Sequence, residues 1–367
     1  MIDFRSLPKV ALAALALPLL TTAASPPVEQ TNKAAAVPED WAPPGGRIGY
    51  VLWDEYWGIR ETEGGKEECP NGWNIGPREQ FAILYPDNGK KRKLVDTQLA
   101  YESQVWFPDT RPDGFEYHEA TGKYALGIDL DGKHSPEDFI SDDGRTGIDN
   151  QLFRVVGCVR NYRKEGELGI ITTKWRQQNR FNRVVFELSN VDSLKNDPDV
   201  TVSYFRTLDH LLADSTGHFL PGGSQRIDTR FGKRFHVSTK GRIVNGVLET
   251  DPVDLELPEL ALSDPSIIKF KGMKLRLTLT PEKAEGVLGG YADVEQWYYA
   301  MNTSWATHHA SYGQASAPSI YRALRRLADG YPDPKTGENT AISAAMDIKL
   351  VQVYVIHPET ESLMSSR

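Results

Sequence analysis

Short apolar segments separated by turn residues follow one another along most of this chain. The clearest segment alternates apolar with basic or hydroxyl side chains, in the order Met273, Lys274, Leu275, Arg276, Leu277, Thr278, Leu279 and Thr280. A period of two places the apolar side chains on one face of an extended chain and the polar ones on the other. The pattern predicts an antiparallel strand with one solvated face.

Further β-type segments precede and follow this strand. We expect strands at Ile48–Trp53, Gln80–Tyr85, Gln151–Val159, Gly169–Trp175, Asn182–Leu188, Val200–Thr207, Val253–Leu257, Ile267–Phe270 and Ile348–Ile356. Arg234–Thr239 and Ile243–Glu249 flank Lys240-Gly241 and are predicted to form a hairpin. Many short strands with Gly- and Pro-rich turns, and no strand–helix alternation, predict a mainly β fold. We expect an antiparallel β-sandwich or jelly roll.

Two helices are expected before the last strand. Apolar and aromatic side chains recur at helical spacing after Asp293, a residue suited to cap a helix N-terminus, at Val294, Trp297, Tyr298, Met301, Trp305 and His308. A second helix is expected from Pro318 to the stop signal at Gly330. The two helices predict a helical hairpin at about residues 291–330, inserted before the final strand of the β fold.

The first 24 residues have the order of a secretory signal peptide. Arg5 and Lys9 precede an apolar run from Val10 to Leu20, and the small residues Thr22-Ala23-Ala24 follow as a cleavage site. The apolar run is shorter than the roughly 20 residues that cross a bilayer. The sequence therefore predicts removal of residues 1–24 and a secreted or periplasmic location. An uncleaved anchor or a short buried helix is the alternative.

The rest of the chain divides into a tether and a globular region. Residues 25–46 contain five prolines and two glycines and are predicted to be a tether. Residues 47–367 are expected to form one large β domain or two packed ones. A net charge of −8 argues against binding to a nucleic-acid backbone. No later apolar run reaches about 18 residues, so no transmembrane span is expected in the mature chain.

Two cysteines, Cys69 and Cys158, are present. In an oxidising compartment an even number of cysteines suggests a disulfide. A bridge between them would close a loop of about 90 residues and restrict the unfolded chain by roughly 4–5 kcal/mol. The alternative is two unrelated buried thiols.

Residues 128–150 form the most acidic segment of the chain. Asp129, Asp131, Asp142, Asp143 and Asp149 lie near glycines in this segment, as Ca²⁺ ligands often do. The segment lacks the EF-hand pattern, because no Glu stands at the twelfth position. The hypothesis is a calcium site. The alternative is a set of solvated turns, which Asp-Gly sequences commonly form.

Other polar and aromatic residues are candidate ligand contacts. Asn150 and Gln151 follow the acidic segment directly, and could bind a ligand or satisfy buried backbone groups. Five of the eight tryptophans lie before residue 107, among them Trp53, Trp57 and Trp106. Exposed Trp side chains are typical platforms for sugar rings, whereas buried ones fill a core.

No catalytic motif accompanies these features. The chain has no G-x-S-x-G elbow, no phosphate-binding loop, no dinucleotide glycine pattern and no HExxH pair. The leading hypothesis is an exported, non-enzymatic protein, stabilised by calcium, that binds a glycan or an envelope protein. One alternative is a secreted polysaccharide hydrolase or lyase, whose catalytic residues can lie far apart in sequence. Another is an accessory subunit of an extracytoplasmic complex.

Overall fold

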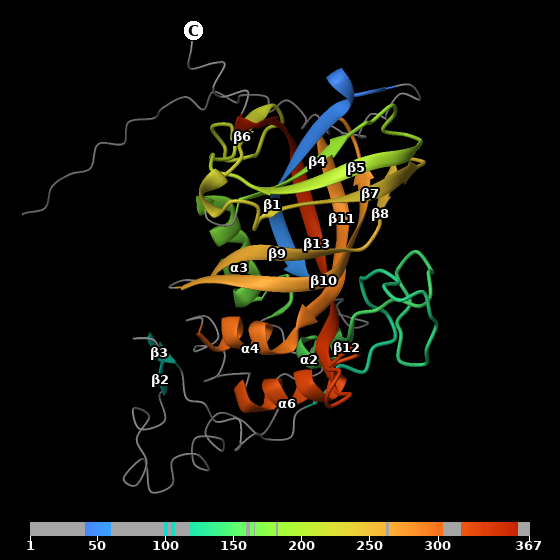
Figure 1. Cartoon of the computed structure of the whole chain (residues 1–367), viewed down its shortest axis with the longest axis vertical. Coiled ribbons are helices and arrows are strands. Elements are labelled where there is room, and N and C mark those ends of the chain that lie inside the picture. The colour runs from blue at the N-terminus through green and yellow to red at the C-terminus, as the bar shows by residue number, and fades with distance from the viewer. Residues whose placement is uncertain are drawn as a thin grey trace, which may run out of the picture. The chain divides into compact units, whose positions relative to one another are not determined.

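One antiparallel sheet closes on itself to form the centre of the molecule. The computed structural model describes residues 41–59, 99–101, 104–106, 118–158, 162–164, 166–180, 183–261, 264–303 and 317–358. Around the closed sheet the strands follow in the order β1 (Arg47–Trp57), β4 (Val184–Ser189), β5 (Asp197–Arg206), β7 (His236–Val244), β8 (Val247–Thr250), β10 (Asp264–Leu279), β11 (Lys283–Asp293) and β13 (Asn339–Ile356). Pairing of β13 with β1 closes the barrel (Figure 1).

Five further strands lie outside this ring. They are β6 (Gly223–Arg226) and β12 (Gly330–Pro332), which pair with β13, β9 (Val253–Ala261), which pairs with β10, and the separate pair β2 (Leu99–Tyr101) and β3 (Gln104–Trp106). The prediction of a mainly β, antiparallel fold is confirmed. The closed ring is a barrel rather than the predicted sandwich or jelly roll. Alternation shows that one face of a strand is buried, but it does not show whether that face packs on a second sheet or across a barrel.

The barrel interior is filled by the apolar faces of its strands. Met273, Leu275, Leu277 and Leu279 are each at most 2% exposed, as their alternation predicts. Tyr50 of β1 lies among them, and its hydroxyl donates a hydrogen bond to the Thr280 carbonyl at 2.7 Å. Burial raises the pKa of the Tyr50 phenol. This hydrogen bond satisfies a polar group that would otherwise be costly to bury.

A helix, α3 (Glu167–Gln178), packs against β1 and brings a buried ion pair. The Arg176 guanidinium binds the Glu55 carboxylate, and these side chains are 0% and 1% exposed. Arg176 also donates to the Pro258 carbonyl of β9 at 3.4 Å. Arg176 therefore connects the helix to two strands at once.

Two predicted strands are helices. Residues 151–159 contain α2 (Gln151–Val156), and residues 169–175 lie inside α3. A short apolar run has the same composition in a buried helix and in a buried strand, so periodicity cannot separate them. The predicted strand Gln80–Tyr85 lies outside the described residues.

The hairpin between β7 and β8 turns at a different place from the predicted one. Lys240-Gly241 lies within β7, and the turn is Asn245-Gly246, with φ of 51° and 79°. Two consecutive positive φ values define a type I′ turn, for which Asn-Gly is the preferred sequence. The pairs Ile243–Leu248 and Val244–Val247 flank this turn.

Both C-terminal helices are present. α4 (Val294–Thr303) begins at Asp293, whose Oδ1 accepts a hydrogen bond from the Gln296 N–H at 2.8 Å. α6 (Ala317–Leu327) buries Ile320 and Leu324. The chain that joins them lies outside the described residues, so the helical hairpin stays a prediction. The last strand is longer than predicted, because β13 begins at Asn339 rather than near Ile348.

The described part of the chain starts within the predicted tether. Trp41 packs against the core, and its carbonyl accepts a hydrogen bond from Leu194 at 3.1 Å. A short 3₁₀ helix, η1 (Pro44–Gly46), then leads into β1. The predicted signal peptide and residues 25–40 lie outside the described residues. None of the helices that the structure describes is long and apolar enough to cross a membrane.

The buried ion pair gives a test of this packing. Glu55→Gln keeps the side-chain shape but leaves the Arg176 charge unpaired, so we expect the free energy of unfolding to fall by about 3–5 kcal/mol in urea titrations. Glu285→Gln is the matched control, because the Lys283–Glu285 pair is about half exposed. An exposed pair contributes about 0–1 kcal/mol. Equal losses in the two variants would contradict the role given to Arg176.

Candidate metal centre and the adjoining cleft

The acidic segment folds so that its two ends meet. The Asp149 N–H donates a hydrogen bond to the Ile128 carbonyl at 3.1 Å, and Phe139 and Ile148 form a second bridge. Ile128 and Leu130 pack on side chains of β11 and β13, including Ala341 and Ala345. This contact fixes the segment on the outer face of the barrel. It also places Asp149 beside Asp129 and Asp131.

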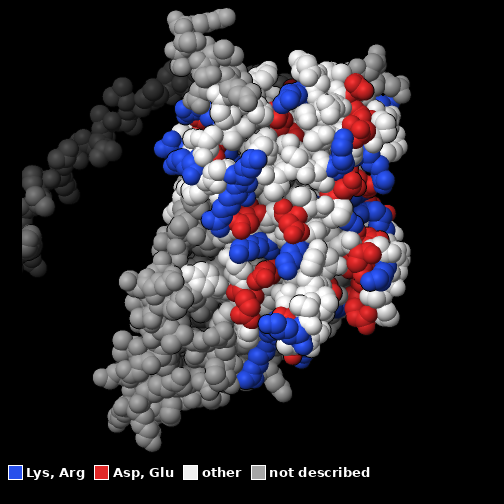
Figure 2. Space-filling view, in the orientation of Figure 1, with Lys and Arg blue, Asp and Glu red and all other residues white. Residues whose placement is uncertain are grey.

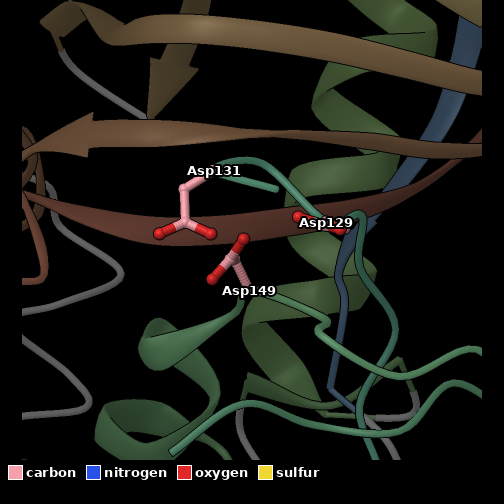
Figure 3. Close-up of side chains that lie close together, drawn as sticks. All are labelled: Asp129, Asp131 and Asp149. Carbon is pink, nitrogen blue, oxygen red and sulfur yellow. The ribbon is translucent and has the colours of Figure 1, made fainter. Parts of the chain in front are cut away.

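These three aspartates form a compact cluster. Each offers a carboxylate oxygen, and the three oxygens lie within 4.8 Å of one another. Figure 3 shows the carboxylates of Asp131 and Asp149 pointing toward each other. Ca²⁺ binds oxygen at about 2.3–2.6 Å, so two ligands on opposite sides of one ion are about 4.8 Å apart. The spacing is therefore compatible with a shared cation.

Backbone N–H groups orient all three carboxylates. Gly132 donates to Asp129 Oδ1 at 2.7 Å, and Lys133 donates to Asp131 Oδ1 at 2.8 Å. Leu130 donates to Asp149 Oδ2 at 2.6 Å. The first two bonds are those of ordinary Asx turns, so the turn interpretation accounts for them as well. Each carboxylate keeps a second oxygen that can reach a ligand.

Asp149 differs from its two neighbours in burial. It is 6% exposed, whereas Asp131 is exposed and Asp129 is intermediate. Burial, together with the charges of Asp131, Asp138 and Asp329, outweighs the hydrogen bond from Leu130 and raises the pKa of Asp149 to about 7. The protonated form of this carboxyl group is therefore favoured up to a much higher pH than in a free aspartate. A bound cation would replace that proton.

Of the two lysines near the cluster, one holds its backbone and the other pairs with a carboxylate at the surface. Lys274 of β10 donates to the carbonyls of Asp129 and Leu130, both at 3.0 Å. Lys133 lies 3.3 Å from Asp131 but its side chain is 79% exposed. The sequence identified Lys274 only as part of a solvated face. Its structural role depends on a loop more than 120 residues earlier in the chain.

Asp142 and Asp143, which the calcium hypothesis also included, are not part of this cluster. Asp143 accepts hydrogen bonds from the Ser141 hydroxyl and from Arg145, the latter at 2.9 Å. These bonds lower the pKa of Asp143 to about 2. Asp142 is an exposed residue of the same turn. The turn interpretation therefore describes this part of the segment better.

The predicted ligand contacts are used largely by the protein itself. The Asn150 amide donates to the carbonyls of Gly58 and Leu126, at 3.0 and 2.8 Å, and the Gln151 amide donates to that of Glu137 at 3.1 Å. Trp53 packs against Phe219 with the rings tilted by 54°, and Trp57 contacts Trp297 edge-on, with ring centroids 5.3 and 5.9 Å apart. These contacts account for the four residues without a ligand.

The structure describes only part of the remaining predicted residues, which are Trp106, Cys69 and Cys158. Trp106 ends β3, and its side chain lies outside the described part of the chain. Cys158 is fully buried, and its sulfur lies 3.3 Å from the His118 carbonyl oxygen. Cys69 also lies outside the described residues, so the bridge between the two cysteines stays a prediction.

A cleft of about 960 Å³ lies between the acidic segment and the outer face of β7, β8 and β10. Its charged lining residues are Asp129, Arg145, Asp199, Lys240, Arg242, Glu249, Asp251, Lys274 and Arg276. The Glu249 carboxylate is shared by two guanidinium groups, those of Arg242, at 2.8 Å, and Arg276. Side chains of both signs also alternate over the face of the molecule in Figure 2. No local sequence pattern predicts this cleft, because its residues come from separate strands and from the acidic segment.

Comparisons with protein families, with curated proteins and with solved structures found no match to this chain. Functional inference therefore depends on the geometry of the described residues.

The raised pKa of Asp149 makes stability depend on pH. In the unfolded chain an aspartate titrates near 3.9, so between about pH 4 and pH 7 the folded state binds the proton more tightly. Stability is therefore lost as the pH rises through this range, and the loss is complete above the folded pKa. In EDTA, we expect urea unfolding to show lower stability at pH 8 than at pH 5, with a weaker dependence in Asp149→Asn. Asp143→Asn is the control, since its pKa lies below this window. An unchanged pH dependence in Asp149→Asn would contradict the prediction.

The calcium hypothesis makes a separate prediction about metal. Millimolar Ca²⁺ should raise the melting temperature of the mature chain relative to EDTA, because a ligand at 100 times its Kd stabilises by about 2.7 kcal/mol. Asp131→Asn and Asp149→Asn should abolish the shift, and Asp143→Asn should retain it. A shift that survives in Asp149→Asn, or no shift in the wild type, would contradict the calcium hypothesis. The three aspartates would then be interpreted as residues of solvated turns.

Proposed function

We propose that this chain is an exported, non-enzymatic binding protein that holds an acidic oligosaccharide in the cleft beside the Asp129, Asp131 and Asp149 cluster. The cleft is the observation on which the proposal depends. Its volume of about 960 Å³ suits a ligand of a few sugar rings. The predicted signal peptide supports a role outside the cytoplasm, where such polymers occur.

The charges of the cleft favour an anionic ligand. Among its lining residues five are basic and four are acidic, although the whole chain carries a net charge of −8. Arg242 and Arg276 share the carboxylate of Glu249, and Arg276 Nη2 also lies 3.9 Å from Asp143. The two guanidinium groups together have more N–H donors than these contacts use. Guanidinium groups bind carboxylates with two parallel hydrogen bonds. A uronic acid residue presents such a carboxylate.

The aspartate cluster would add to this binding if it holds calcium. Asp129 belongs both to the cluster and to the cleft lining. A cation bound there would place positive charge at the edge of the cleft. Hydroxyl and carboxylate oxygens of a sugar could then complete a coordination shell of six to eight oxygens.

Two of the carboxylates that line the cleft favour binding over hydrolysis, because they are held in ion pairs. A glycosidase needs one carboxyl group that donates a proton and a second that acts as base or nucleophile. Asp199 is paired with Lys240 at 2.7 Å, and Glu249 is held by two arginines, so both carboxylates are already engaged in ion pairs. No tryptophan is among the described residues that line this cleft. The hydrolase or lyase alternative therefore has less support.

The proposal predicts charge-selective binding. By titration calorimetry in calcium, the mature protein should bind an oligogalacturonate and should not bind a neutral cello-oligosaccharide of the same length. Arg242→Gln and Arg276→Gln should each weaken binding about tenfold or more, because a hydrogen bond between charged groups contributes about 1.5–3 kcal/mol.

Arg325→Gln is the matched control, since Arg325 lies on α6 and pairs with Glu338. Equal affinity for the neutral oligomer would contradict the proposal. New reducing ends appearing in the mixture would instead support the hydrolase alternative.

A further inference from the structure

A second cleft, of about 1060 Å³, lies where β1 begins and β13 ends. Its walls combine the first residues of β1, Glu187 of β4, Phe205 of β5, the last residues of β13 and the segment Thr229–His236. This segment contains the 3₁₀ helix η8 (Thr229–Phe231). The two clefts share no lining residue.

One part of this second cleft is apolar and rigid. Phe205 and Phe235 are 3% and 4% exposed, whereas Tyr354 is 63% exposed. Trp41 packs against the core beside them. Four prolines also line the cleft, at positions 43, 44, 281 and 358. Rings with few rotatable bonds can contact a ligand at a low cost in conformational entropy.

The buried carboxylates of this cleft are already neutralised. The side chain of Glu187 is 7% exposed and lies 3.0 Å from His357 Nε2 and 3.4 Å from Arg47 Nη1. Asp228, with no exposed side-chain surface, lies 2.8 Å from Arg230 and 3.5 Å from Arg206. Both carboxylates therefore have basic partners within the protein.

Basic groups remain exposed at the edge of the cleft. The Arg47 side chain is 58% exposed and that of His357 is 32% exposed. His236 is exposed as well, with its ring 4.6 Å from that of Phe205. The segment Thr229–His236 also carries Lys233, together with Arg230, which pairs with Asp228, and Arg234, which pairs with Glu256.

We infer that this second cleft binds a small amphiphilic anion. An aromatic ring or an acyl chain packs on Tyr354, Trp41 and the neighbouring prolines, over the buried rings of Phe205 and Phe235. A carboxylate, sulfonate or phosphate group lies at the edge and accepts hydrogen bonds from the exposed guanidinium group of Arg47. Charge-assisted hydrogen bonds of this kind are roughly twice as strong as neutral ones, so the anionic group sets both affinity and orientation.

The probe for this site is 1-anilinonaphthalene-8-sulfonate, an aromatic sulfonate whose fluorescence rises in an apolar site. We expect saturable binding to the folded mature protein, with energy transfer from tryptophan, and displacement by monomeric decanoate. Decyltrimethylammonium has the same chain length and the opposite charge, and should compete at least about tenfold more weakly. Equal competition by the two, or binding only to vesicles of anionic lipid, would overturn the inference.

Two variants locate the probe. Arg47→Gln should weaken probe and decanoate binding about tenfold, and Tyr354→Ala should weaken both through lost contact area. Tyr354 is the more exposed residue, so its variant keeps the test valid if Arg47→Gln lowers the melting temperature. Arg242→Gln is the control, because it alters only the first cleft and should leave probe binding unchanged. Unchanged affinity in both Arg47→Gln and Tyr354→Ala would place the probe elsewhere and overturn the inference.

Discussion

The pairing of β13 with both β11 and β1 is the interaction on which the rest of the structure depends. Residues 341–351 of β13 pair with β11, and residues 346–353 pair with β1 on the other side. Closing a sheet in this way removes its open edges and encloses one apolar interior. Without this strand the sheet would have two free edges, and the side chains around Tyr50 would lose one wall of the core.

The same strand positions both clefts. At its start, the small side chains of Ala341 and Ala345 leave room for Ile128 and Leu130, and the Ser343 hydroxyl accepts a hydrogen bond from the Gln151 N–H at 2.8 Å. These contacts fix the acidic segment that borders the first cleft. At its end, residues 353–357 form a wall of the second cleft. One long strand therefore determines where two unrelated loop regions can present their side chains.

Local patterns in the sequence predict the strands better than the sites. The alternation at 273–279 is visible because each neighbour of a strand residue lies on the opposite face. The apolar runs of α2 and α3 are short, so their pattern predicts strands where the structure has helices. Asp129, Asp131 and Asp149 could be identified as candidate ligands from composition. That Asp149 joins the other two, while Asp143 pairs with Arg145, depends on the Ile128–Asp149 bridge, and that contact has no local sequence signal.

Net charge is a poor guide to what this protein can bind. The chain carries an excess of eight acidic residues, yet both clefts present basic groups whose carboxylate neighbours are already engaged. In the first cleft Glu249 lies between two arginines, and in the second Glu187 lies between Arg47 and His357. A ligand responds to the potential inside a cleft, where low-dielectric walls concentrate the field of nearby charges. The excess acidic charge on the outer surface acts on solubility and on long-range approach, whereas in both proposals these paired groups select the anion.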